Sequence, residues 1–391
     1  MSGLLALGDA QNRLLELAPR MPATTVAVDR AVGRYLATNV IASRTQPPAN
    51  LSAMDGYALC GPGPWTIVGE SRAGHGFRGV IRPGQAVKIS TGAKVPPVGD
   101  RILLKEDAVL DGDVLAVSDQ ASPRHIRPYG FDFNLGETVL QAGTRVGPGQ
   151  LALALSAGKA ELEVARPPVV AIIDSGDELG ADPSDLAPNQ IPASNGAMIA
   201  AMLHQEGCET VRLGPVPDDH DALAKALVKA EGADIVVTSG GASVGDHDLI
   251  QDALRRWGAE LAFWKVAIKP GKPLMVAKRG SQVILGLPGN PVSSFVTCFL
   301  FALPLVRAAM GVPAPLPSTQ SLVAAQDLPA VGKRREFLRG VSDGTRVRLA
   351  TSQDSSALRA LASANCLIER PEGSPAAREG EPVPVYNLQN G

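Results

Sequence analysis

Hydrophobic side chains near the N-terminus follow a helical spacing. Leu4, Leu7, Leu14, Leu15 and Leu17 form an apolar stripe ahead of the extended segment TTVAVDR. Apolar positions that recur every three to four residues predict a helix that packs one face against a core. We therefore expect residues 1 to about 45 to be largely helical. Charged residues interrupt the stripe and no small-residue cleavage site follows it, so a signal peptide is not indicated.

The pattern changes to short alternating segments between Met54 and about Asp132. QAVKIST, DRILLKED and DVLAVS are separated by glycine and proline, which is typical of strands and turns in a small β-rich domain. The later segment GETVLQAGTRVGPGQLALALSAG returns to helical spacing, and VARPP at 164–168 has the composition of a linker. The β-rich stretch is therefore expected to be an insertion within an N-terminal domain.

Beyond the linker, apolar runs alternate with amphipathic stretches. The predicted strands are VVAIID, ADIVVTS and SQVILGL, and the predicted helices cover Asn195–Glu206, Asp219–Lys229, 245–257 and a segment beginning near Pro291. This alternation predicts a parallel sheet with helices on both faces, which is a doubly wound α/β domain. Pro313, Pro315 and Pro317 form a second linker, after which short strands such as VPVYNL return.

These patterns predict an α/β multidomain protein. The expected domains are a helical N-terminal domain over 1–47 plus 133–166, a β-rich insertion over 48–132, a doubly wound domain over 167–313 and a C-terminal β domain over 314–391. A length of 391 residues agrees with several cores, since single cores seldom exceed 250–300 residues.

Composition narrows the functional classes. Apolar residues make up 45% of the chain and the formal net charge is −2, so neither disorder nor binding to nucleic acid or an anionic membrane is indicated. The apolar stretch from Pro291 to Met310 contains prolines, serines and Arg307, and we interpret it as a buried helix. The four cysteines form no C-x-x-C pair, which favours reduced structural thiols in the cytoplasm.

Three polar loops directly follow the predicted strands of the doubly wound domain. They are Ser175–Leu179, Ser239–Asp248 and Pro288–Ser294. Ligands of open parallel sheets bind beyond the carboxyl ends of the strands, so the loops should share one rim. A single glycine-containing loop would be an ordinary turn, but three together favour a phosphate site built from backbone N–H groups.

The third loop also has the residues that start a helix. Asn290 is a suitable N-cap and Pro291 fits the first helical position, which would place Ser293 and Ser294 in the first turn. His247 lies inside the second loop. The other four histidines, His75, His125, His204 and His220, have no spacing that indicates a metal site or a catalytic triad.

A basic segment lies between the second and third loops. Phe263–Pro273 contains Lys265, Lys269 and Lys272. A solvated surface is the ordinary explanation of clustered lysines, but lysines beside proline and glycine in a tight turn are better explained by a bound anion. Carboxylates on the same rim, from Asp177 to Asp248, would repel that anion unless a divalent cation or a proton donor lies between the charges.

Taken together, SAMDGYA, STGA, SGDEL, SGGASVGDHD, FWKVAIKPGKP, LPGNPVSS and KRREFLRG resemble the ordered motifs of the MoeA/gephyrin E-domain family. The resemblance covers roughly residues 1 to 390. It implies a MogA-like doubly wound domain that binds molybdopterin, a barrel-like C-terminal domain, and an elongated homodimer with its active site in a cleft shared by two subunits. It also implies insertion of molybdate into adenylylated molybdopterin with release of AMP, assisted by Mg²⁺.

The resemblance assigns functional residues by motif. The catalytic candidates are Asp55, Thr91, Asp132, Glu178, Asp218 and Asp248, with Glu178 and Asp248 as metal ligands. The substrate-binding candidates are Ser239, Gly240, Gly241, Ser243, Gly289, Asn290, Ser293 and Ser294. The molybdate-binding candidates are Lys265, Lys269, Lys272, Pro273 and Arg339. Without the resemblance, Asp55-Gly56 would be an ordinary turn, and Asp132 and Asp218 ordinary loop acids.

Two alternatives stay open at this stage. The doubly wound domain alone would also resemble an adenylyltransferase that makes the adenylylated pterin from ATP, although SAMDGYA has no evident purpose there. A non-catalytic, gephyrin-like scaffold is the second, but the chain has no long linker or appended partner domain. The expected substrates are adenylylated molybdopterin and molybdate. The expected protein partners are the adenylyltransferase and molybdoenzyme chaperones.

Overall fold

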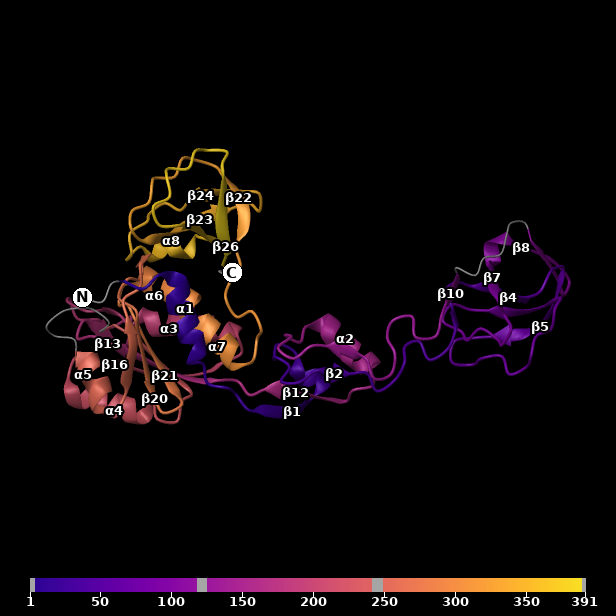
Figure 1. The fold of residues 1–391 in the computed structure, drawn as a ribbon, viewed down its shortest axis with the longest axis horizontal. Coiled ribbons are helices and arrows are strands. Elements are labelled where there is room, and N and C mark those ends of the chain that lie inside the picture. Colours follow the sequence, from indigo (N-terminus) through magenta and orange to yellow (C-terminus); the bar gives the residue numbers. More distant parts are fainter. Residues whose placement is uncertain (1–3, 118–124, 241–248, 389–391) are drawn as a thin grey trace. The chain divides into compact units, whose positions relative to one another are not determined.

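The computed structural model describes residues 4–117, 125–240 and 249–388 (Figure 1). The chain forms two compact units. The large unit contains Met1–Thr24, Gly33–Ala37 and Val164–Gly391, and the small unit contains Thr25–Val32 and Thr38–Glu163. The four-domain boundaries expected from the sequence stay a prediction.

The small unit contains a six-stranded sheet in the order β7-β4-β6-β5-β9-β8. Its strands are β4 (Gly56–Cys60), β5 (Trp65–Ser71), β6 (Gln85–Ile89), β7 (Arg101–Leu104), β8 (Ala108–Asp111) and β9 (Val114–Val117). Tyr57, Leu59 and Leu103 belong to its core. The predicted β-rich stretch is therefore confirmed, and the return to helical spacing corresponds to α2 (Pro148–Ser156).

Smaller pairings complete the small unit and its ends. β3 (Leu51–Ser52) pairs with β10 (Ile126–Arg127), and β2 (Val40–Ile41) pairs with β11 (Thr138–Leu140). β1 (Ala23–Ala27) pairs with β12 (Glu161–Ala165), and a 3₁₀ turn, η1, covers Val28–Ala31. The small unit is thus built mainly from short strands, with α2 as its α-helix among the described residues.

The N-terminal helix is shorter than the sequence pattern suggests. α1 covers Leu7–Glu16 and buries Leu7 and Leu14. Pro19 and Pro22 follow, and proline lacks the N–H that would extend a helix. The β-branched residues after them form β1 instead, because such side chains favour strands.

The large unit contains a six-stranded sheet in the order β16-β13-β17-β21-β20-β18. β16 (Glu209–Val216), β13 (Val169–Ser175), β17 (Ile235–Ser239) and β21 (Gln282–Leu287) are parallel. At one edge β20 (Met275–Arg279) pairs antiparallel with β21, and β18 (Glu260–Trp264) pairs antiparallel with β20. The three strands predicted from the sequence are parallel, whereas β18 and β20 were not predicted. Only two residues separate β20 from β21, and so short a connection permits only an antiparallel hairpin.

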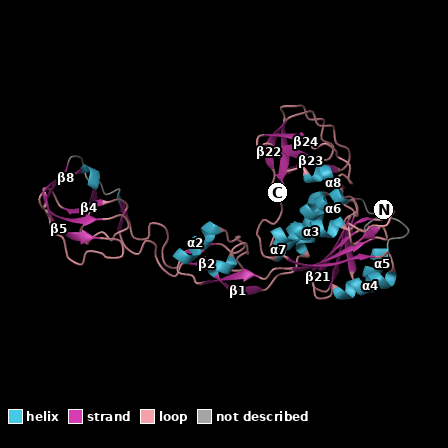
Figure 2. Ribbon diagram, turned by 180° about the vertical axis from the view of Figure 1, so that it is seen from behind, coloured by secondary structure: helices cyan, strands magenta, loops and turns pink. Residues whose placement is uncertain are grey.

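Helices cover both faces of this sheet (Figure 2). α3 (Ser194–Gln205), α6 (Pro291–Thr297) and α7 (Leu303–Ala309) share a core with Val170 and Ile172 of β13. α4 (His220–Lys229) and α5 (Leu249–Arg256) cover Ala171 and Ile173. Successive residues of a strand point to opposite faces, so both cores bury β13 and the doubly wound architecture is confirmed.

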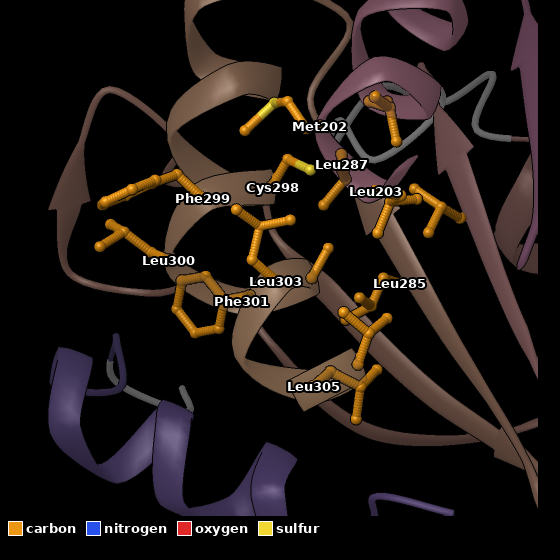
Figure 3. Close-up of a cluster of buried hydrophobic side chains, with 14 of the residues drawn as sticks. Met202, Leu203, Leu285, Leu287, Cys298, Phe299, Leu300, Phe301, Leu303 and Leu305 are labelled. Carbon is orange, nitrogen blue, oxygen red and sulfur yellow. The ribbon is translucent and has the colours of Figure 1, made fainter. Parts of the chain in front are cut away.

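The apolar segment after β21 lies in the first of these cores. Pro291–Ala309 is long and apolar enough to cross a membrane, but 89% of it is buried inside the fold. Its middle turn, Cys298–Ala302, is a π-helix labelled η4. Phe299, Phe301 and Leu303 belong to the same buried cluster as Leu203 and Leu285 (Figure 3). The interpretation as a buried helix is confirmed, with Asn290 as N-cap and Pro291 in the first turn.

The C-terminal strands close into a five-stranded barrel. Its order is β23-β24-β22-β26-β25, and β25 pairs back with β23. The strands are β22 (Gln320–Ala324), β23 (Arg335–Ser342), β24 (Arg346–Leu349), β25 (Cys366–Arg370) and β26 (Pro382–Asn387), with the short helix α8 (Leu358–Ala362) between two of them. β19 (Ile268–Lys269) joins β23 from outside. This confirms the barrel-like C-terminal region.

The four cysteines, Cys60, Cys208, Cys298 and Cys366, are free and buried. Burial raises the pKa of Cys208 to about 12 and that of Cys366 to about 11. Thiols in such surroundings stay protonated and unreactive, which agrees with the structural role expected from the sequence.

Candidate functional site

A cavity of about 730 Å³ lies at the carboxyl ends of the parallel strands in the large unit. Ser175, Ser239 and Pro288, which end or follow β13, β17 and β21, all line it. Neighbouring parallel strands end at the same edge of a sheet, and ligands bind there. The described parts of the three polar loops therefore share one rim, as the sequence predicts.

Four substrate-binding candidates, Ser239, Gly240, Gly289 and Asn290, line this rim cavity. Gly240 has φ of +98°, and a Cβ atom there would lie 2.5 Å from the Ser175 carbonyl oxygen. The close approach of two strand ends therefore requires glycine. Gly241, Ser243, Asp248 and His247 lie outside the described residues.

Two further substrate-binding candidates are more deeply placed than the sequence suggests. Ser293 and Ser294 are buried, and Ser294 is fully enclosed. The Val292 N–H, in the same first turn, donates a hydrogen bond to the Ser355 carbonyl at 3.1 Å. Asn290 Nδ2 donates to Ser355 Oγ at 3.2 Å. The start of α6 is thus covered by the segment that follows β24.

Acidic residues form another wall of the rim cavity. Glu178 and Asp218 both line it. Ser175 Oγ donates to Asp218 Oδ1 at 2.9 Å, and the Asp218 N–H donates to Asp177 Oδ1 at 3.0 Å. These bonds hold Asp218 at the end of β13, so the structure brings together two of the acids that the resemblance assigns.

Sequence reasoning missed Asp174, the last polar residue of the apolar run VVAIID. Asp174 is only 4% exposed and lines the rim cavity. Burial raises the pKa of its carboxyl from 3.8 to about 6, while Arg212 and the Gly196 N–H act in the opposite direction. An acid that ends a buried strand beside a ligand-binding edge is a signal that could have identified it.

The basic residues gather in a second cavity, of about 360 Å³. Lys269, Lys272 and Pro273 line it from the turn after β19, and Arg339 lines it from β23. The structure therefore brings these four predicted residues together. Lys265, the fifth, has φ of +66° and places its Nζ atom 4.1 Å from the centre of the Trp264 ring.

Arg339 is the most enclosed charge of the basic cavity, being 1% exposed. Its Nη2 atom donates to the carbonyl oxygens of Ser352 at 2.9 Å and Asp354 at 3.1 Å. Its Nε atom is buried without a hydrogen-bond partner among the described residues. Burial lowers the pKa of Arg339, and Asp354 partly offsets this. A guanidinium always keeps its charge in proteins, so a buried cationic N–H group is left available.

The two cavities meet at Pro273, which lines both. The cis peptide bond between Lys269 and Pro270 turns the chain within this segment. A ligand in the rim cavity and an anion in the basic cavity would therefore be neighbours.

In the small unit, Asp55 and Thr91 are joined by hydrogen bonds. The Thr91 N–H donates to Asp55 Oδ1 at 2.7 Å, and the Thr91 hydroxyl donates to the same oxygen at 3.1 Å. These bonds, the backbone one first, lower the pKa of Asp55 below its ordinary value. Asp132 is also exposed, and its N–H donates to the Gln46 carbonyl at 3.0 Å.

The described residues do not form a complete set of metal ligands. Within residues 4–117, 125–240 and 249–388, no three His, Cys, Asp or Glu side chains gather closely enough to bind a metal ion. Of the two expected metal ligands, Glu178 lines the rim cavity and Asp248 lies outside the described residues. The metal site stays a prediction.

Comparisons with known proteins cover nearly the whole chain. Residues 5–158 match the family model described as the MoeA N-terminal region (domain I and II). Residues 171–308 match a probable molybdopterin binding domain, and residues 321–388 match the MoeA C-terminal region (domain IV).

Individual relatives agree with these matches. The molybdopterin molybdenumtransferase of Haemophilus influenzae is 32% identical over 402 residues, which cover 98% of this chain and 99% of the relative. Molybdopterin molybdenumtransferase 2 of Mycobacterium tuberculosis is 35% identical over 384 residues, 93% of this chain and 95% of its own. The crystal structure of the molybdopterin biosynthesis MoeA protein from Pyrococcus horikoshii OT3 is similar with a TM-score of 0.86 at 26% identity, covering 99% of this chain and 100% of that one.

Proposed function

This chain belongs to the MoeA family, and from that membership we propose that it is a molybdopterin molybdenumtransferase, which inserts molybdenum into molybdopterin. In this reaction adenylylated molybdopterin and molybdate are the substrates, and AMP is released. The names of the full-length relatives support the assignment. They do not favour the two alternatives, an ATP-dependent adenylyltransferase and a scaffold.

The observation that carries the proposal is the meeting of a large neutral-to-acidic cavity with a smaller basic one at Pro273. The rim cavity, of about 730 Å³, has the size of sites that enclose cofactor-sized molecules. The basic cavity, of about 360 Å³, has room for a small oxyanion, and Lys269, Lys272 and Arg339 line it. Adjacency matters because molybdenum must reach the dithiolene sulfurs of a pterin that is already bound.

The basic cavity supplies what molybdate requires. A dianion enclosed away from water needs fixed positive charge and N–H donors. Lys269 and Lys272 supply ammonium groups, and the Nε–H of Arg339 is the unpartnered donor. We assign molybdate to these residues together with Pro273, and Lys265 stays a more distant candidate.

The strand-end loops would hold the phosphate part of the pterin substrate. Ser239, Gly240, Gly289 and Asn290 line the rim, and the loop that continues through Gly241 and Ser243 belongs to the same proposal. Ser294 is buried, so its contribution would be to shape the start of α6, whereas Ser293 lines the basic cavity.

We also propose that a second copy of the chain completes the site through Asp55 and Thr91. The supporting observation is that the Asp55 carboxylate is exposed, ionised and held rigidly by Thr91, as a group that acts on a ligand must be. Asp132, Glu178, Asp218 and Asp248 are the remaining catalytic candidates. Mg²⁺ would assist at Glu178 and Asp248, and the chain would act in the cytoplasm.

The direct test is release of AMP from adenylylated molybdopterin by the purified protein. We expect release to require both the protein and molybdate, and Lys278→Ala, which removes an exposed lysine of β20, to behave as the unmodified protein. Consumption of ATP with molybdopterin, without molybdate-dependent release of AMP, would instead identify an adenylyltransferase. Absence of both activities in a folded dimer would favour the scaffold.

A further inference from the structure

Two buried acceptor atoms at the rim cavity have no hydrogen-bond partner among the described residues. They are Asp174 Oδ1 and Asn195 Oδ1, and both residues line the cavity. Buried polar atoms are nearly always hydrogen-bonded, because leaving one unpaired destabilises the fold. A pair of unpaired acceptors in one cavity therefore indicates a ligand with hydrogen-bond donors.

The local backbone fixes what each side chain can offer. The Gly196 N–H donates to the Asp174 carboxyl, and a Cβ atom at position 196 would lie 2.0 Å from Asp174 Oδ2. Glycine thus allows the start of α3 to approach one carboxyl oxygen closely and leaves Oδ1 for another partner. Asp174 lies at the end of β13, between two paired strands, so it has little freedom to turn elsewhere.

The Asn195 amide is fixed in a complementary way. Its Nδ2 atom donates to the Gly289 carbonyl at 2.6 Å, which commits the donor end of the side chain. The remaining oxygen, Oδ1, can only accept hydrogen bonds. Each of these two cavity-lining residues therefore keeps one buried acceptor without a partner among the described residues.

We propose that Asp174 and Asn195 recognise the aminopyrimidinone edge of the pterin in the substrate, accepting hydrogen bonds from its ring N–H and exocyclic amino group. The inference rests on the proposed function and names the part of the substrate that occupies this wall. The choice follows from the pattern of donors. A pterin presents two adjacent donors on this edge, whereas the corresponding edge of adenine presents one donor beside an acceptor, which would face a second acceptor atom.

Burial and charge agree with a neutral donor as the occupant. Burial raises the pKa of the Asp174 carboxyl, and the positive charge of Arg212 of β16 lowers it by a smaller amount. No salt bridge involves Asp174 in the part of the chain that is described. Its oxygen is therefore free for N–H donors of a heterocycle.

The test compares binding of two simple probes, 6-hydroxymethylpterin and AMP, to the full-length protein and to Asp174→Asn. Asparagine has the shape of aspartate, but its oxygen would accept the Gly196 N–H and its amide nitrogen would then face the cavity. We expect Asp174→Asn to weaken pterin binding at least tenfold and to leave AMP binding within about twofold. Asp343→Asn, which removes a carboxylate from the turn between β23 and β24, is the matched control and should bind both probes normally.

Two results would overturn the inference. Equal pterin binding by Asp174→Asn and the unmodified protein would show that the carboxyl does not contact the pterin, and selective loss of AMP binding would assign this wall to adenine. If Asp174→Asn does not fold, as judged by circular dichroism, Asn195→Ala carries the same expectation for the two probes.

The proposed function is tested separately by molybdate-dependent AMP release in the unmodified protein. Failure of that reaction would reject the transferase. Normal release with an unchanged KM for adenylylated molybdopterin in Asp174→Asn would reject only the assignment of the pterin edge. A rise in KM with a smaller change in kcat is the outcome expected of a residue that positions the substrate.

Discussion

The Lys269 Nζ atom lies 2.9 Å from Glu336 Oε1, at the point where β19 pairs with β23. This ion pair joins the basic turn of the doubly wound domain to a strand of the barrel. Both residues line the basic cavity, so Glu336 holds Lys269 in place and also competes for its charge.

Lys269→Ala should raise the KM for molybdate about tenfold, because one charge-assisted contact to the anion is lost. Stability should change by less than about 1 kcal/mol, since Lys269 is more than half exposed and exposed ion pairs contribute little. Molybdate titrations of AMP release measure the effect. Lys278→Ala is the matched control, and an equal rise in its KM would mean that general surface charge, rather than this turn, attracts molybdate.

Arg339→Lys should abolish molybdate saturation and also destabilise the fold. Lysine cannot donate to both the Ser352 and Asp354 carbonyls while keeping a donor for the anion, because it lacks the planar fork of arginine. Each buried carbonyl left unpaired costs about 1–3 kcal/mol. Urea denaturation and molybdate titration measure the two effects. In the exposed pair of Arg346 with Glu379, Arg346→Lys should change neither.

Asp174→Asn should stabilise the protein at neutral pH and not at pH 3.5. The folded pKa of about 6 exceeds the ordinary value of 3.8, so the native state binds the proton more tightly than the unfolded chain. Stability therefore falls as pH rises from 3.8 to about 6, by at most about 3 kcal/mol at 1.36 kcal/mol for each pKa unit. Asparagine removes this penalty.

Unfolding curves at several pH values measure this difference. Asp343→Asn gives the opposite control, because hydrogen bonds from Arg346 and Thr345 lower the pKa of Asp343 to about 2. That carboxylate contributes stability above the unfolded pKa, so its removal should destabilise at neutral pH. A gain in stability for Asp174→Asn that did not depend on pH would contradict the ionisation described for Asp174.

Gly196→Ala should weaken pterin binding because the new methyl group would lie 2.0 Å from Asp174 Oδ2. The carboxyl must move, and its hydrogen bond from the Gly196 N–H is lost. Gly8→Ala is a suitable control: Gly8 lies in α1 with nothing within 4 Å of an added Cβ. It should gain about 0.5–1 kcal/mol, as expected for alanine in a helix. Calorimetric binding of 6-hydroxymethylpterin and thermal unfolding provide the measurements.

Asp55→Asn should abolish AMP release and leave dimerisation unchanged, since Asp55 is exposed and its bonds to Thr91 are local. Because the pKa of Asp55 is lowered, its carboxylate stays ionised at and above the ordinary pKa of an aspartate. A loss of rate with falling pH above that value should therefore arise from another group. If the site is shared, mixing Asp55→Asn with Lys269→Ala should give each mixed dimer one intact site, which recovers the unmodified KM for molybdate that neither parent dimer shows. No recovery after verified subunit exchange would place both groups in the same chain.

The sequence predicts the parts of the fold that depend on local pattern. β13, β17 and β21 are continuous apolar runs, and their shared edge could be predicted because parallel strands end together. The strand β16 was missed because ETVRLGPV contains polar residues, glycine and proline and lacks a continuous apolar run. The antiparallel edge depends on the short hairpin between β20 and β21. It was not predicted, because the basic segment just before β20 was interpreted as a turn.

The candidate site, like the fold, could be predicted from the sequence only in part. The residues of the basic turn and Arg339 were grouped correctly, but only by resemblance, since about 70 residues separate them along the chain. Ser294 was predicted to lie in the first turn of a helix, and its burial could not be predicted. The start of that helix is covered by Ser355, which is distant in the sequence and bonds to Asn290 and Val292. Asp174 was taken as part of a strand, because its unpaired oxygen arises only when Gly196 comes close.

The C-terminal region that contains the closed barrel contributes residues to both cavities. A chain that ended after α7 would keep the part of the rim cavity at the ends of β13, β17 and β21. It would lose Ser356 and Leu358 from that cavity, and Arg339 with the other barrel residues from the basic cavity. Such a shortened protein could hold a nucleotide-linked heterocycle and could not enclose an oxyanion beside it. The five-stranded barrel therefore supplies the buried charge of the site at which we propose that molybdate binds.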